Sequence, residues 1–129
     1  MTTARDLITM SLRTLSVLHV GETPAAEDAD DALDTLNQMV NSWINNGLDM
    51  EWVTMTSLDD TVPYPDDHIG PLRHNLAMHL SPDYGVSPSM TVAALAQSGY
   101  EMLRKRYLVN RELVIDSPLT RSTETSVLV

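Results

Sequence analysis

The stretch TPAAEDADDALDTLNQMVNSWINNG, residues 23–47, carries the clearest helical pattern of the chain. Thr23 can cap a helix, Pro24 fits its first position, and Gly47 can close it. Acidic and amide side chains occupy one face. The other face repeats apolar residues every three or four positions, which predicts a long amphipathic helix: Ala25, Ala29, Ala32, Leu33, Leu36, Val40, Trp43 and Ile44.

The residues before this stretch show the same period. Thr2 or Thr3 can cap a first helix. Gly21 can take the left-handed closing conformation, so we expect the helix to end around residues 19–21. The expected buried face consists of Ala4, Leu7, Ile8, Ser11, Leu15 and Leu18.

Two further helices are expected in the second half. One spans about 71–80 and is followed by a break at 81–85, which is rich in turn formers. The other begins at Ser87-Pro88 and ends near Tyr107, with three basic residues in its last turn to offset the helix dipole. Gly99 suggests a close helix contact. The residues expected to be buried are Leu72, Leu76 and Leu80 in the first of these helices, and Val92, Leu95, Ala96, Gly99 and Leu103 in the second.

Residues 48–67 lose the helical period. Residues 51–56 alternate and contain β-formers, so a short strand or hairpin is expected around 51–64. Pro63 and Pro65 exclude a helix there and favour extended backbone. The pair Asp59-Asp60 marks the expected turn.

The chain changes character after residue 108. We divide it into a helical domain, 1–108, and an extended C-terminal tail, 109–129. The tail is largely polar but carries two apolar triplets. Such patches suggest that the tail docks onto a partner. The triplets are Leu113-Val114-Ile115 and Val127-Leu128-Val129.

Composition excludes several classes of protein. The 129 residues are 43% apolar and include no cysteine and no phenylalanine, but eight methionines. The absence of cysteine excludes disulfides and thiolate metal sites. No apolar run is long enough to span a bilayer, and the N-terminus does not follow the order of a signal peptide, so we expect a soluble protein. The net charge of −10 argues against tight binding to nucleic acid.

No pattern predicts an active site. His68, His74 and His79 are spaced by six and five residues, which places them on different helix faces, so we expect ordinary surface histidines and no metal or cofactor. The acidic pairs at 59–60 and 66–67 are typical of turns and caps. There is no nucleophile elbow and no phosphate loop. Trp43 is expected in the core, and Trp52 over the helix pair or against a neighbouring subunit.

Several motifs, in order, resemble the head-to-tail adaptor family of short-tailed and related phages, also called tail accessory factors. The resemblance covers roughly residues 3–107. The segment 59–65 looks shorter than the β-containing insertion of larger members. The motifs are TARDLI at 3–8, GETP at 21–24 with Glu27, Ala32-Leu33, Leu36-Asn37, Ser42-Trp43 to Gly47-Leu48, NLA at 75–77, SPDYG at 81–85 and Ser87-Pro88.

The resemblance implies a mainly α fold: a four-helix adaptor bundle with a short β-like loop or hairpin around 51–64 and an extended tail. It implies a structural virion protein, made in the host cytoplasm and placed at the portal–tail junction. Such proteins form a ring, commonly of twelve copies, that binds the portal and extends the DNA channel. They help retain packaged DNA and receive the next tail component, a nozzle or tail tube protein. DNA would pass the channel without specific binding, and no membrane is involved.

The expected contact residues lie in the tail. We hypothesise that it anchors the chain to the portal and to neighbouring subunits, with Arg111 and Glu112 setting the register. The apolar contacts would come from Leu113, Val114, Ile115, Val127, Leu128 and Val129. A small cytosolic helical module that binds a partner protein is the alternative. An enzyme using the acidic and histidine residues of 59–79 is a third and weaker one.

Overall fold

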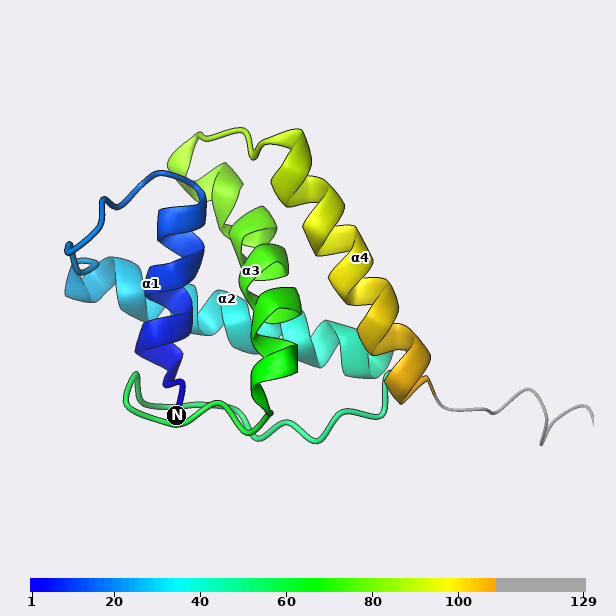
Figure 1. Cartoon of the computed structure of the whole chain (residues 1–129). Coiled ribbons are helices and arrows are strands. Elements are labelled where there is room, and N and C mark those ends of the chain that lie inside the picture. Colours follow the sequence, from blue (N-terminus) through cyan, green and yellow to red (C-terminus); the bar gives the residue numbers. More distant parts are fainter. Residues whose placement is uncertain (109–129) are drawn as a thin grey trace, which may run out of the picture.

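A computed structural model describes residues 1–108, which fold into four α-helices (Figure 1). The helices are α1 (Ala4–Thr14), α2 (Ala26–Asn45), α3 (Ile69–Tyr84) and α4 (Met90–Tyr107), and the short 3-10 helix η1 (Asp66–His68) precedes α3. The prediction of a mainly α fold with four helices is therefore confirmed.

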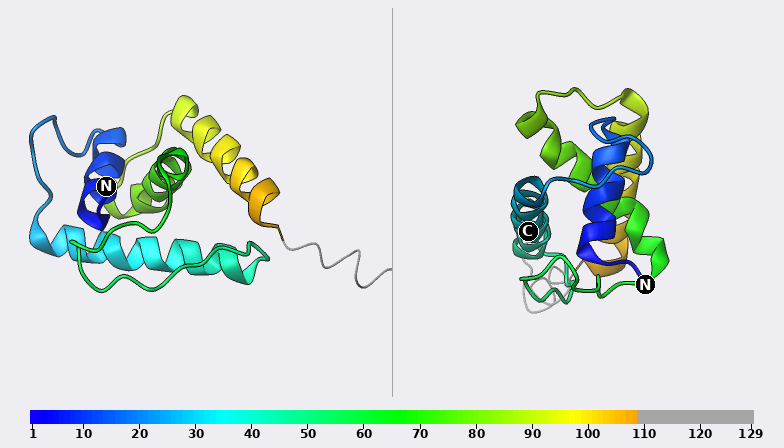
Figure 2. Two further views of the ribbon diagram at one scale, coloured as in Figure 1. Left: turned by 60° about the horizontal axis from the view of Figure 1, so that its bottom comes forward. Right: turned by 90° about the vertical axis from the view of Figure 1, so that its left-hand side faces the viewer.

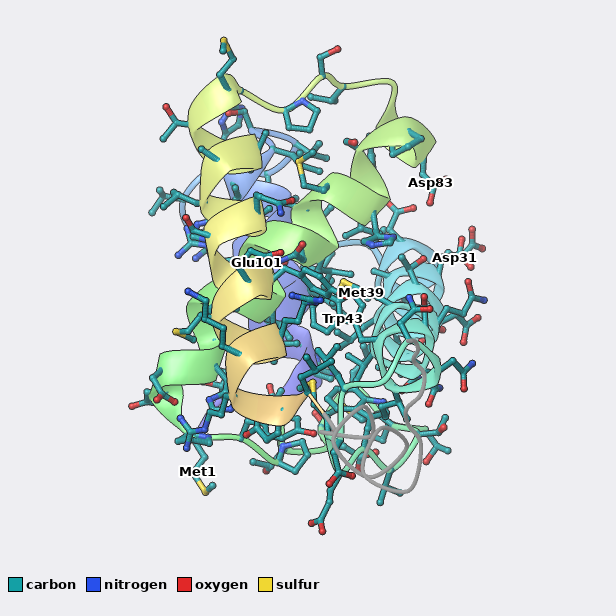
Figure 3. All side chains as sticks on the ribbon, turned by 90° about the vertical axis from the view of Figure 1, so that its right-hand side faces the viewer. Met1, Asp31, Met39, Trp43, Asp83 and Glu101 are labelled. Carbon is teal, nitrogen blue, oxygen red and sulfur yellow. The ribbon has the colours of Figure 1, made fainter. Side chains whose placement is uncertain are left out.

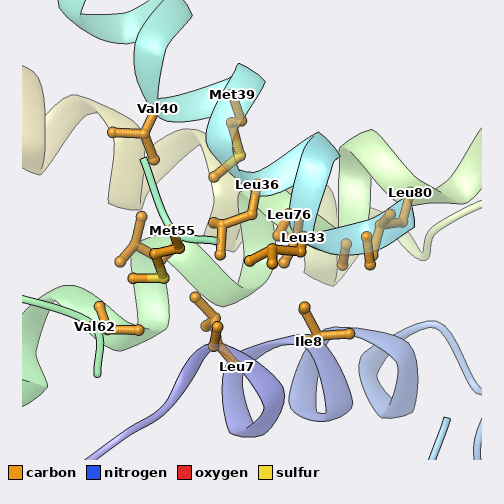
Figure 4. Close-up of a cluster of buried hydrophobic side chains, with 14 of the residues drawn as sticks. Leu7, Ile8, Leu33, Leu36, Met39, Val40, Met55, Val62, Leu76 and Leu80 are labelled. Carbon is orange, nitrogen blue, oxygen red and sulfur yellow. The ribbon is translucent and has the colours of Figure 1, made fainter. Parts of the chain in front are cut away.

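Helix α3 is the centre of the bundle, since it contacts α1, α2 and α4. Figure 2 shows α1 and α3 lying side by side across α2, while α4 covers the other side of α3. Leucine, methionine, isoleucine and valine side chains from α1, α2, α3 and the long loop of residues 49–65 meet between these layers (Figure 4). The labelled core residues are Leu7, Ile8, Leu33, Leu36, Met39, Val40, Met55, Val62, Leu76 and Leu80.

Helix α1 begins at the expected residue but ends early. The Thr3 hydroxyl accepts a hydrogen bond from the Asp6 amide, and the Asp6 carboxylate accepts one from the Thr3 amide, forming a capping box. The helix stops at Thr14 because Ser16 takes the left-handed conformation at φ 62°. The Val17 amide then donates to the Leu12 carbonyl, as in a Schellman motif, so the predicted end at residues 19–21 is wrong.

Two of the predicted helix starts are also displaced. Helix α2 begins at Ala26, after an N-cap at Ala25 that offers no side-chain bond, so Thr23 and Pro24 lie in the preceding segment. Helix α4 begins at Met90, because the Ser89 hydroxyl accepts from the Val92 amide and caps it instead of the predicted Ser87-Pro88 start.

Helix α3 continues through the break predicted at residues 81–85. Pro82 lies in its last turn and has no N–H for the Met78 carbonyl. The Ser81 hydroxyl donates to that carbonyl at 2.9 Å, which replaces the missing backbone bond. Gly85, at φ 64°, then ends the helix. The Ser81 hydroxyl therefore allows α3 to continue past Pro82, whereas the sequence alone indicated a break there.

Residues 49–65 form an extended loop along the bottom of the bundle in Figure 1. Within residues 1–108 the β-pairing consists of two isolated bridges, Thr3 with Thr61 and Leu48 with Leu108, so the loop is not a hairpin. The predicted turn is present, because the Asp60 carboxylate accepts the amides of Thr56 and Ser57. The β-formers of 51–56 thus lie extended without a strand partner in that range.

Candidate interaction surfaces

The end of α4 is fixed to the long loop just before the predicted tail. The Asp49 amide donates to the Tyr107 carbonyl at 2.6 Å, and Leu108 forms an antiparallel bridge with Leu48. The structure describes nothing beyond Leu108. The predicted contact residues therefore lie outside the described part of the chain: Arg111, Glu112, Leu113, Val114, Ile115, Val127, Leu128 and Val129.

A polar cluster around His68 holds this junction. His68 is 0% exposed, so the prediction that it is a surface histidine is wrong. Its Nε2 lies 2.6 Å from the Tyr107 hydroxyl, and its Nδ1 lies 2.6 Å from the Asp67 carboxylate. Tyr64 stacks on the imidazole, with 5.1 Å between ring centroids. No spacing rule could have found this cluster, since His68 and Tyr107 are brought together only by the fold.

The cluster is arranged to hold the fold together. The hydrogen bond with His68, supported by Arg106 at 3.2 Å, keeps the pKa of the Asp67 carboxyl below its usual range. Burial raises the pKa of Tyr64 to about 12. The Tyr64 hydroxyl donates a hydrogen bond to the Glu51 carbonyl at 2.6 Å. Both nitrogens of His68 are already hydrogen-bonded. The group therefore ties α4 to η1 and to the long loop.

Two other histidines, His74 and His79, are not part of the cluster around His68. His74 is half-buried on α3 and His79 is exposed further along that helix. Among residues 1–108, no group of three His, Cys, Asp or Glu side chains is placed to hold a metal ion. Trp43 is buried, as predicted, and Trp52 is partly buried with its indole N–H donating to Asn37.

Acidic side chains gather where α2 begins and α3 ends. Asp31 and Asp83 project from neighbouring parts of α2 and α3 (Figure 3). Burial, and then the carboxylates of Asp28, Asp83 and Asp31, raise the pKa of Tyr84. The basic trio 104–106 lies in the last turn of α4, as predicted. At that end of α4, Asp67 pairs with Arg106, so part of this positive charge is balanced.

An apolar groove runs between α3 and α4. It has a volume of about 280 Å³ and is open to solvent. Leu95 is 45% exposed and Met102 is 41% exposed, so the prediction that Leu95 is buried is wrong. Of the predicted α4 core, Ala96 and Leu103 are buried. The groove is lined by Asp67, Gly70, Pro71, His74, Leu95, Ser98, Gly99 and Met102.

Gly99 permits the close approach of the two helices that form this groove. A Cβ at Gly99 would lie 2.8 Å from the Pro71 Cα, a clash with backbone. We expect Gly99→Ala to lower the free energy of unfolding by about 1–2 kcal/mol, since overpacking outweighs the roughly 1 kcal/mol helical preference of alanine. Urea denaturation measures the difference.

Gly70 provides the matched control for that substitution. It also lies in a helix beside the groove, but a Cβ there meets nothing within 4 Å. Gly70→Ala should therefore leave stability unchanged or raise it slightly. Equal losses for both variants would show that Gly99 is not a packing contact.

No helix within residues 1–108 is long and apolar enough to cross a membrane. A comparison with protein-family models gives a match to the P22 tail accessory factor over residues 1–121. The matched region includes all four helices and the first apolar triplet of the predicted tail.

Proposed function

Because the chain belongs to the P22 tail accessory factor family, a family of phage tail-associated proteins, we propose that it is the head-to-tail adaptor of a virion. It binds the portal protein, extends the DNA channel, and presents the surface on which a nozzle or tail tube protein assembles. The observation that carries the proposal is the family match itself, which spans 1–121 and so includes the helical body and part of the tail.

The role is structural and does not involve catalysis. Support comes from the His68 cluster, where hydrogen bonds to Asp67 and Tyr107 occupy both imidazole nitrogens. The net charge of −10 also suits a channel wall that DNA passes without being held. The protein ring would help retain packaged DNA by enclosing it, and not through specific contacts with it.

The chain works as two parts in this proposal. Residues 1–108 form the adaptor domain, and 109–129 form a docking tail that attaches it to the portal and to neighbouring copies. A body of this size has limited buried surface and gains stability from lateral packing in a ring, for which we propose twelve copies. The proposed contact residues are Arg111, Glu112, Leu113, Val114, Ile115, Val127, Leu128 and Val129.

Deleting residues 110–129 tests the attachment. We expect the truncated protein to lose binding to the portal of the same phage in co-sedimentation, because the apolar triplets are gone. Its helical circular dichroism should be unchanged, since α1–α4 end before the deletion. Portal binding by the truncated protein would exclude the tail as the anchor.

A pair of triple variants separates the effect of the tail's apolar side chains from the effect of its length. Changing Leu113, Val114 and Ile115 to serine keeps the length and should weaken portal attachment strongly. Changing Thr120, Ser122 and Thr123 to alanine alters three polar residues of the same tail and should have little effect. Equal effects of the two triple variants would contradict the assignment of apolar contacts.

A further inference from the structure

The last turn of α4 is held to the helical body by contacts of Tyr107 and its neighbours, and not by the core. Leu103 is 0% exposed and is the last buried side chain of the helix, since none of residues 104–108 is buried. Tyr107 is half-buried, whereas the other four residues of this turn are exposed. The place where the chain leaves the body therefore depends on one side chain and its partners.

Tyr107 is held through its side chain and through its backbone. Its hydroxyl lies 2.6 Å from Nε2 of the buried His68, and its ring packs edge-on against that imidazole, with 5.5 Å between ring centroids. Its carbonyl accepts the Asp49 amide at 2.6 Å, and the next residue, Leu108, forms a bridge with Leu48. We call these contacts the Tyr107 latch. They bring the ends of α2 and α4 together (Figure 1).

The imidazole that receives Tyr107 is itself fixed in position. Tyr64 stacks on His68 with an interplanar angle of 3°, and the Asp67 carboxylate lies 2.6 Å from Nδ1. Asp67 also pairs at 3.2 Å with Arg106 from the last turn of α4. Because hydrogen bonds are directional, a buried ring held on its face and at Nδ1 offers one position to the Tyr107 hydroxyl. The latch therefore places the end of α4 in a single position.

We propose that the Tyr107 latch positions the docking tail for attachment to the portal, an inference that rests on the proposed function. The proposed contact residues begin at Arg111, three residues beyond Leu108. With the latch closed, Arg111 stays within about 11 Å of Leu108, whereas with the latch open it can reach about 29 Å from Leu103, the last core residue. Closing the latch confines the contact residues to a smaller volume, which raises their effective concentration at the portal roughly 10-fold.

Tyr107→Ala in the full-length protein tests this, because it removes the hydroxyl and the ring but leaves the buried residues of α4 in place. We expect its affinity for the portal to fall about 10-fold in a co-sedimentation titration, since the tail is no longer confined. In hydrogen exchange followed by NMR, the amides of Asp49 and Leu108 should lose protection, because both are bonded to carbonyls of the last turn. Tyr107→Phe keeps the ring and should lie between the wild type and Tyr107→Ala in both measurements.

Tyr100→Ala is the matched control, since Tyr100 is also half-buried on α4 and lies about two turns before Tyr107. Its ring packs against Trp43, with 5.3 Å between ring centroids, and takes no part in the latch. This variant loses packing within the fold but should keep the protection of the Asp49 and Leu108 amides and the portal affinity of the wild type. Circular dichroism sets a temperature at which both alanine variants are folded.

Two results would overturn the inference while leaving the adaptor role intact. One is full protection of the Asp49 amide in Tyr107→Ala. The other is a portal affinity of Tyr107→Ala no weaker than that of Tyr100→Ala, which would show that Tyr107 has only a structural role. Failure of the wild-type protein to bind the portal is a separate result, seen before any substitution is made, and would contradict the adaptor role together with the inference that rests on it.

Discussion

Replacing Asn37 by alanine is expected to lower the free energy of unfolding by about 3 kcal/mol, because buried backbone groups lose their partners. The Asn37 amide donates to the Met55 carbonyl at 2.9 Å, and its carbonyl oxygen accepts the Met55 amide at 2.9 Å. It also accepts the Trp52 indole N–H at 3.1 Å. One side chain on α2 thus supplies the pairing that a strand partner would give the long loop.

Asn41→Ala is the control, since Asn41 lies one turn further along α2 and is exposed. It should change stability by less than about 0.5 kcal/mol. Urea denaturation followed by circular dichroism measures both variants, and Trp52 fluorescence reports on the loop. Equal stability of the two variants would mean that the loop does not depend on Asn37.

Replacing Leu76 by alanine should lower the free energy of unfolding by about 3 kcal/mol or more, through lost apolar burial and the cavity that remains. Leu76 is 0% exposed on α3, the helix that contacts all three others. The cavity would open in the layer shown in Figure 4, between α1, α2 and α3. Chemical denaturation gives the value.

Leu95→Ala is the matched control, because it removes the same atoms from the open groove. Leu95 keeps 45% of its surface exposed, so its truncation should cost about 1 kcal/mol, well below the loss at Leu76. A loss at Leu95 as large as that at Leu76 would contradict the assignment of a core at α3 and an open groove beside α4.

The helical pattern of the sequence predicted much of this core, because period and burial are directly linked. Leu7, Ile8, Leu36, Leu72 and Leu76 were all expected to be buried, and all are. The Thr3 cap and the close contact at Gly99 were also predicted correctly. The Thr3 cap depends on local sequence, and the close helix contact depends on the missing side chain of Gly99.

Helix ends were predicted less well, because they depend on contacts that a local pattern does not contain. Ser16 ends α1 in a conformation usually taken by glycine. Pro82 stays within α3 because Ser81 satisfies the Met78 carbonyl. Ser89, and not Ser87, caps α4.

The exposure of individual side chains was also predicted less well, for the same reason. Leu95 follows the helical period of a core residue, yet α4 packs on one side only and leaves it exposed. His68 looked like a surface histidine, but Tyr64 stacks on it and Tyr107, from the distant end of α4, closes over it. Tertiary contacts decide such positions. The tail residues were assigned from composition and resemblance, and their role stays a prediction.

Electron microscopy of the protein, alone and mixed with the portal of the same phage, tests the central claim most directly. The account predicts rings that cap the narrow end of the portal, with twelve copies around an open channel. A protein that remains monomeric and does not bind the portal would contradict the adaptor role and favour a small helical module with another partner.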